Sequence, residues 1–166
     1  MGFKFVPDKN QPYRIFSLGA TFAPEGVIVG NLRDGDPQLT PHFKAHEFAC
    51  PDCKVYKIAI RTLEGLENVR VRAGVPLEVA KTTLTSVVNS GGSGYRCWRH
   101  NAETPHSSSH SKHMMGYAVD VHPTGTLTVA ELYKLMDSEP VFHGGGLGLY
   151  KDFVHGDSWA KRRWQG

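Results

Sequence analysis

A histidine and an aspartate stand seven residues apart in SKHMMGYAVD, which spans residues 111–120. His113 and Asp120 offer an imidazole nitrogen and a carboxylate oxygen, two donor types that catalytic zinc ions bind. Such a zinc ion usually takes three protein ligands and keeps one position open for water or substrate. His155 in DFVHGD is the natural third ligand, because it ends an apolar segment and is flanked by carboxylates. From residue types and spacing alone, both a catalytic zinc site and the alternative, a polar loop that runs into a strand, stay open.

Hydrolysis by a metal-activated water also needs a group that accepts a proton. Asp152 lies three residues before His155, and Asp157 lies two residues after it. On a regular strand only Asp157 would share a face with His155, because side chains alternate between faces. Both aspartates remain candidates for the general base.

A second pattern combines three cysteines with a histidine, in CPDC at 50–53 and CWRH at 97–100. Three thiolates and one imidazole, from Cys50, Cys53, Cys97 and His100, would make a closed structural zinc site. The alternatives are reduced thiols or a Cys50–Cys53 redox pair, since an odd number of cysteines makes no disulfide framework.

Composition excludes several classes of protein. The 166 residues suffice for one domain with a real core, and 40% hydrophobic with 21% charged residues is ordinary for a folded protein. A net charge of +3 suits attraction to an anionic surface such as a bacterial cell wall, but it is too weak to indicate nucleic-acid binding. The sequence predicts no membrane insertion, and the start MGFKFVPDKNQPYR is predicted not to be a signal peptide. Synthesis in the cytoplasm is therefore expected, and a monomer is favoured.

The metal ligands need a strand and a turn to bring them together. YAVDV at 117–121 is predicted to be a short strand in which Asp120 shares a face with Ala118. The two valines can then face the core while Asp120 points into a cleft. Gly116 permits the turn that would bring His113 back over the strand.

Helices and a hairpin complete the expected fold. Apolar residues approximate a helical stripe over 55–73 with Gly74 as the stop, and Thr128 with Glu131 fits a capping box at the start of a second helix. GGGLGLY and DFVH predict a turn and two strands, an arrangement that can form a hairpin. This order of elements predicts an α+β fold, with a small, mostly antiparallel sheet and helices packed on one side.

The same stretches resemble a known family. SKHMMGYAVD matches the S-x-H-x-x-G-x-A-x-D signature of zinc D-alanyl-D-alanine carboxypeptidases and related cell-wall endopeptidases, which share the hedgehog-type zinc peptidase fold. HFKAHEFAC, SGYRCWRHN, GGGLGLYKDFVHGD and RRW resemble further family segments in the family's order. The resemblance covers roughly residues 41–165. It implies a zinc peptidase domain over 41–166, preceded by a β-rich arm of unknown role over 1–40.

The resemblance also implies roles for individual residues. By this resemblance, the zinc ligands are His113, Asp120 and His155. Arg96 of the S-G-Y-R loop would bind a substrate carboxylate or stabilise the oxyanion, and Ser111 would hydrogen-bond the substrate. Some relatives carry the catalytic acid at the position of Asp152 and others at that of Asp157, so both assignments stay open.

These features predict a zinc metallopeptidase that hydrolyses peptide bonds in peptidoglycan stem peptides or cross-links, through a metal-activated water and an aspartate general base. A phage or prophage endolysin is the expected setting, acting on the cell wall after release. The alternatives are a non-catalytic zinc-containing module that binds cell wall or protein, and a phage structural component with residues 1–40 as a docking arm. The acids near His155 argue against a binding module, which has no need of a base.

Overall fold

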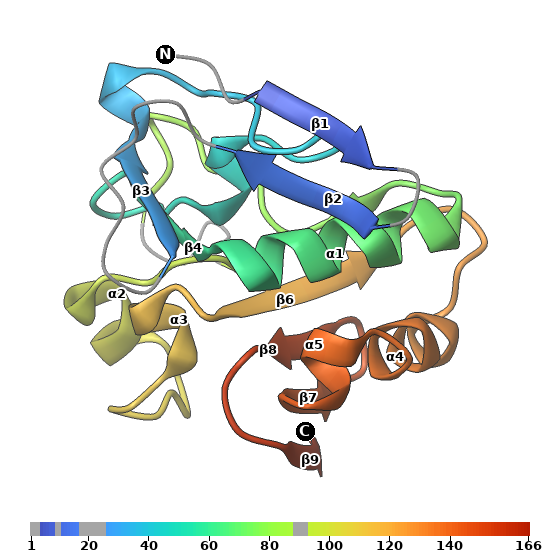
Figure 1. Cartoon of the computed structure of the whole chain (residues 1–166). Coiled ribbons are helices and arrows are strands. Elements are labelled where there is room, and N and C mark those ends of the chain that lie inside the picture. Colours follow the sequence, from blue (N-terminus) through green and yellow to red (C-terminus); the bar gives the residue numbers. More distant parts are fainter. Residues whose placement is uncertain (1–3, 9–10, 17–25, 88–92) are drawn as a thin grey trace.

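The computed structural model describes residues 4–8, 11–16, 26–87 and 93–166 and shows an α+β chain (Figure 1), which confirms the predicted fold class. The strands are β1 (Lys4–Asp8), β2 (Gln11–Phe16), β3 (Val27–Asn31), β4 (Val55–Ala59), β5 (Leu77–Glu78), β6 (Ala118–Pro123), β7 (Gly146–Leu149), β8 (Val154–Asp157) and β9 (Arg162–Gln165). The helices are α1 (Ile60–Ala73), α2 (Trp98–Glu103), α3 (Lys112–Met115), α4 (Val129–Asp137) and α5 (Pro140–His143), with the short 3-10 helices η1 (Leu32–Asp34) and η2 (Ala45–Phe48). Within the described residues, no helix has the length and apolar character needed to cross a bilayer.

The largest sheet has five strands in the order β5–β6–β8–β7–β9. β7 and β9 are parallel, and the other neighbours are antiparallel, so the sheet is mostly antiparallel as expected. Its register aligns four residues on neighbouring strands: Asp120, His155, Gly148 and Trp164. Because directly opposed residues share a face, these four form one row across one face of the sheet.

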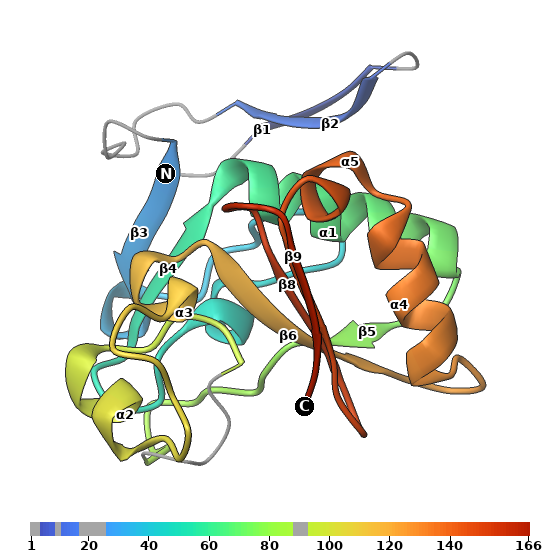
Figure 2. The same ribbon diagram turned by 90° about the horizontal axis from the view of Figure 1, so that it is seen from below.

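Helices cover the opposite face. α4 and α5 pack on strands of the sheet, and α1 packs on α4 and α5. In Figure 2, α4 lies on one side of β8 and β9, and the segment with α2 and α3 lies on the other. The row beside Asp120 contains Val119, Gly156 and Leu147, and both apolar side chains are fully buried. Because helices cover only the face with Val119 and Leu147, the row that contains Asp120 lies on the other face, toward α2 and α3.

The helix expected over 55–73 begins later than predicted. Residues Val55–Ala59 form β4 and pair with β3 in antiparallel register, so α1 begins only at Ile60. Its end is as predicted, because Gly74 adopts the left-handed conformation with φ of 67°. The predicted capping box is also confirmed: Thr128 accepts from the backbone N–H of Glu131, whose side chain bonds back to the backbone of Thr128.

Residues before position 40 contribute to the same core as those after it. Strand β3 pairs with β4, and Val27 and Ile28 on this strand are buried. Leu32 and Leu39 join the core cluster that also contains residues of α1 and β6. The division into an arm over 1–40 and a domain over 41–166 stays a prediction. Residues on both sides of its boundary belong to one hydrophobic core.

Replacing Gly156 by alanine tests the one-sided packing. A Cβ there would lie 2.4 Å from Met136 Cε and 3.0 Å from the Phe142 ring, so overpacking should lower the free energy of unfolding by about 1–3 kcal/mol. Gly144→Ala is the matched control, because its Cβ would meet only the Pro140 carbonyl oxygen, at 3.4 Å. Urea unfolding of both variants measures the difference, and equal stability of the two would contradict this packing.

Candidate metal centre

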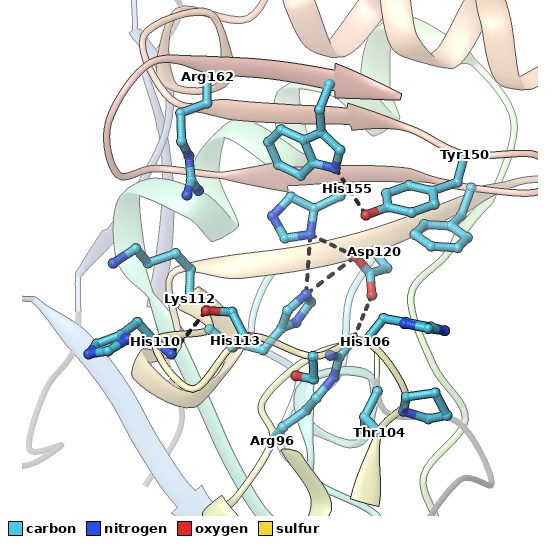
Figure 3. Close-up of a pocket in the computed structure, with 16 residues that line it drawn as sticks. Arg96, Thr104, His106, His110, Lys112, His113, Asp120, Tyr150, His155 and Arg162 are labelled. Atoms are coloured by element: carbon cyan, nitrogen blue, oxygen red, sulfur yellow. Dashed lines mark hydrogen bonds and ion pairs between the residues drawn. The ribbon is translucent and has the colours of Figure 1, made fainter. Parts of the chain in front are cut away.

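Three donor atoms converge at one point on the open face of the sheet (Figure 3). His113 Nε2 lies 3.3 Å from Asp120 Oδ1 and 3.2 Å from His155 Nδ1. His155 Nδ1 lies 2.9 Å from the same Asp120 oxygen. All three residues are almost completely enclosed by protein. The structure thus brings together the three residues predicted to bind zinc, while their role as ligands stays a prediction.

Secondary structure explains this convergence. Asp120 on β6 and His155 on β8 are directly opposed, so their side chains leave the same face of the sheet as neighbours. His113 comes from α3, a single turn that ends at Gly116 with φ of 78°. A Cβ on Gly116 would lie 2.8 Å from Lys57 Cγ and 3.0 Å from its carbonyl oxygen. Glycine at this position therefore permits both the left-handed turn and its close approach to β4.

Hydrogen bonds orient the two imidazoles. His113 Nδ1 donates to the carbonyl oxygen of Gly94 over 2.8 Å, which leaves Nε2 to face the other donors. His155 Nε2 donates to Asp157 Oδ2 over 3.2 Å, which leaves Nδ1 to face them. A carbonyl or carboxylate on the far nitrogen is the usual partner of a metal-binding histidine.

The donor set fits a tetrahedral zinc ion. Bonds of about 2.0–2.1 Å to nitrogen or oxygen give ligand–ligand edges of roughly 3.3 Å in a tetrahedron. The three distances here are 2.9, 3.2 and 3.3 Å. Two imidazole lone pairs and a carboxylate facing one another require a shared cation, either a metal ion or a proton.

The electrostatic surroundings of the three donors differ. Burial would lower the pKa of His155, but hydrogen bonds to Asp120 and Asp157 raise it to about 9. Burial also lowers the pKa of His113, and here it outweighs the nearby Asp120 carboxylate. Burial would raise the pKa of Asp120, yet the two histidines hold it well below its usual value. A zinc ion would therefore compete with a proton on His155.

Asp157 lies beneath His155 and is completely buried. Its Oδ1 accepts from the backbone N–H groups of Gly146 and Trp159 at 3.2 and 3.0 Å. Its Oδ2 accepts from His155 and, over 2.5 Å, from Arg162. Burial would raise the pKa of Asp157, but these bonds, led by that to His155, lower it to about 2. The geometry favours a role in holding His155 over a role in moving a proton.

The other predicted active-site residues occupy different positions. Asp152 is exposed in the turn between β7 and β8 and does not line the cavity above the three donors. Arg96 lines that cavity and donates to Asp120 Oδ2 over 2.9 Å. Ser111 also lines it, at the residue before α3. The roles assigned to these residues stay predictions.

The cavity has a volume of about 520 Å³ and contains residues that sequence reasoning missed. Tyr150 and Arg162 line it, as does Trp164, whose indole N–H donates to the Tyr150 hydroxyl over 2.9 Å. The pairing of β7 with β8 and β9 brings these three residues to the cavity. Their segments, GGGLGLYKDFVHGD and RRW, carry the family resemblance, but the sequence assigned these residues no role in the site. The remaining lining residues are Thr104, Pro105, His106, Ser107, Ser108, His110, Lys112 and Phe153.

Comparison with known proteins gives one match. A family model described as Peptidase M15 matches residues 41–157, a stretch that includes His113, Asp120 and His155. No curated protein and no solved structure matches the chain.

The variant Asp157→Asn tests whether this carboxylate positions His155. Removing the charge should weaken zinc binding by roughly 10- to 100-fold, because a neutral amide is a weaker acceptor for the His155 N–H than a carboxylate is. Competition with a chelator measures the zinc affinity. Asp152→Asn is the control and should bind zinc as the unmodified chain does. If both variants keep full affinity, Asp157 has no part in orienting the histidine.

Proposed function

The chain belongs to the peptidase M15 family, whose members are zinc-dependent, and we propose that it cleaves peptide bonds in bacterial peptidoglycan. The proposed substrates are stem peptides or the cross-links between them, and the proposed reaction is that of a D,D-carboxypeptidase or a cell-wall endopeptidase. The observation that carries the proposal is the convergence of His113, Asp120 and His155 at a cavity large enough for a peptide.

The zinc ion would be held by His113, Asp120 and His155. When bound, zinc supplies an acidified water and polarises a carbonyl group. The chain itself supplies the surroundings: His113 and His155 are held by Gly94 and Asp157. Such fixed orientation keeps the donors in place without reorganisation during the reaction.

Arg96 is the proposed partner for negative charge on the substrate. Its guanidinium lies beside Asp120 and lines the cavity. A cation held there can bind a substrate carboxylate or stabilise the oxyanion that develops at the scissile carbonyl. Ser111 lines the same cavity, and its hydroxyl is proposed to hydrogen-bond the substrate.

Charge in the cavity supports an anionic peptide as substrate. Arg96, Lys112 and Arg162 are cationic, and Asp120 is the one carboxylate among the lining residues of the described chain. Peptidoglycan stem peptides carry free carboxylates, which such a lining would attract. A phage or prophage lysis enzyme that reaches the cell wall after release is the proposed setting.

Asp152 is the proposed general base. Asp157 has both oxygens engaged beneath His155, whereas Asp152 is exposed and directly precedes the cavity-lining Phe153. Proton transfer by Asp152 requires the β7–β8 turn to bring its carboxylate toward the cavity.

A second candidate is a non-catalytic zinc-containing module that binds cell wall or protein. The observation that favours it is that Asp152 lies outside the cavity lining. Binding without hydrolysis needs the zinc and the cationic lining but no base.

Turnover of purified peptidoglycan separates the two candidates. The zinc-loaded chain should release soluble peptides, and their masses identify the bond that is cut. His113→Ala should lose activity to background together with the zinc ion of this site, and adding a chelator should abolish the activity of the unmodified chain. His46→Ala is the matched control, because His46 lies outside the cavity and pairs with Asp36. A zinc-loaded chain that binds peptidoglycan without cleaving it would support the binding module.

Asp152→Asn tests the base. If Asp152 accepts the proton, kcat should fall by about 100-fold or more, with zinc content unchanged. Steady-state kinetics on a synthetic stem peptide, with metal analysis of the same sample, measures both quantities. Unchanged kcat would remove Asp152 from the mechanism.

A further inference from the structure

A second set of metal-binding side chains lies in a different part of the described chain. The sulfur atoms of Cys50, Cys53 and Cys97 lie within 4.8 Å of one another. Zinc–thiolate bonds of about 2.3 Å give sulfur–sulfur edges of roughly 3.8 Å in a tetrahedron, which that spacing accommodates. His100 Nδ1 lies 3.5 Å from Cys50 Sγ, and both residues are buried.

Backbone N–H groups point at two of the sulfur atoms. The N–H of Cys97 donates to Cys50 Sγ, and the N–H of His100 donates to Cys97 Sγ, each over 3.5 Å. Donors directed at sulfur favour the thiolate, which is the form that binds zinc. Once a metal ion is bound, these N–H groups would stabilise the negative charge on Cys50 and Cys97.

The turn that carries the first two cysteines is closed and strained. Cys50 N donates to the Val55 carbonyl over 2.8 Å, and Lys54 N donates to the Cys50 carbonyl over 2.9 Å. Lys54 has φ of 67°, a conformation that is unfavourable for a residue with a side chain. Its ammonium group donates to the carbonyls of Pro51 and Ser86. Non-glycine residues persist in this conformation where the surroundings enforce it, and such positions cluster at functional sites.

His100 offers a fourth donor beside Cys50, while the mutual spacing of 4.8 Å is met by the three sulfur atoms among the described residues. Asp52 Oδ2 lies 3.1 Å from Cys97 Sγ, but both oxygens of Asp52 accept from the Arg99 guanidinium. The imidazole of His100 is buried beside Cys50. Three thiolates and one imidazole fill all four positions of a tetrahedral zinc ion, which is the pattern of a structural site without an open position.

We propose that Cys50, Cys53, Cys97 and His100 bind a second, structural zinc ion. The presence of this zinc does not require peptidase activity, because none of its ligands lines the cavity. It joins the turn at 50–53 to the start of α2.

The segment 94–97 connects the proposed structural zinc site to the candidate catalytic site. Gly94 packs so closely on Phe48 that a Cβ would lie 2.5 Å from Phe48 Cα, and Tyr95 N donates to the Phe48 carbonyl over 3.0 Å. The Gly94 carbonyl accepts from His113, and Arg96 donates to Asp120. A metal ion that fixes Cys97 would hold this segment, and with it Arg96, against the candidate catalytic site.

Metal analysis of the full chain tests the proposal. The unmodified chain should contain two zinc ions, and Cys53→Ser and His100→Ala should each contain one. His113→Ala should also contain one, held by the thiolates. His46→Ala is the matched histidine control and should keep two. Cobalt substitution gives a second readout, since cobalt bound to thiolate shows a charge-transfer band in the near ultraviolet. That band should persist in His113→Ala.

The cobalt spectrum of the unmodified chain decides the matter even if Cys53→Ser does not fold. One zinc ion in the unmodified chain without a thiolate band would overturn the proposal, as would a Cys50–Cys53 disulfide in the metal-loaded protein. A chain that holds two zinc ions but cleaves no peptidoglycan would support this site while contradicting the proposed function.

Discussion

The directly opposed pair Asp120 and His155 is the contact on which the candidate catalytic site depends. Two antiparallel strands place these side chains on one face, and a shift of register by one residue would turn either of them toward the buried face. The valines that flank Asp120 prevent such a shift, because both are fully buried on the helix-covered side. Burial of two apolar side chains thus fixes the position of a metal-binding carboxylate.

Glycines in the sheet provide the space that this arrangement needs. A Cβ on Gly148 would lie 2.4 Å from the Trp164 indole, and one on Gly146 would lie 2.2 Å from Asp157 Oδ2. Trp164 can therefore lie across β7 with its ring centroid 5.1 Å from that of His155. Asp157 can likewise sit under the histidine and bond to the backbone of β7. The glycine-rich strand is a requirement of the site's geometry.

The segment 94–97 links the two metal-binding clusters. On one side it supplies Gly94 and Arg96 to His113 and Asp120, and on the other it ends at Cys97. The sheet fixes Asp120 and His155, but Arg96 comes from a segment without regular secondary structure. Its backbone N–H groups donate to Phe48, His113 and Cys50, from Tyr95, Arg96 and Cys97 in turn, so the segment contacts both clusters, and a metal ion at Cys97 would hold one end of it. The proposed structural zinc and the candidate catalytic site would then depend on each other through a short stretch of chain.

The sequence by itself predicted the α+β class, the strand that carries Asp120, the helix end at Gly74, the capping box at Thr128, and the three residues that converge at the site. These follow from local patterns: alternation, glycine conformations, caps, and ligand types at a fixed spacing. Only the tertiary structure showed that residues Val55–Ala59 form a strand, because pairing with β3 overrides a helical pattern. It also distinguished Asp157, bonded beneath His155, from Asp152 in the exposed turn. Contacts between residues far apart in the chain decide which nitrogen of each histidine faces the site. They also decide which side chains line the cavity. No local sequence pattern encodes such contacts.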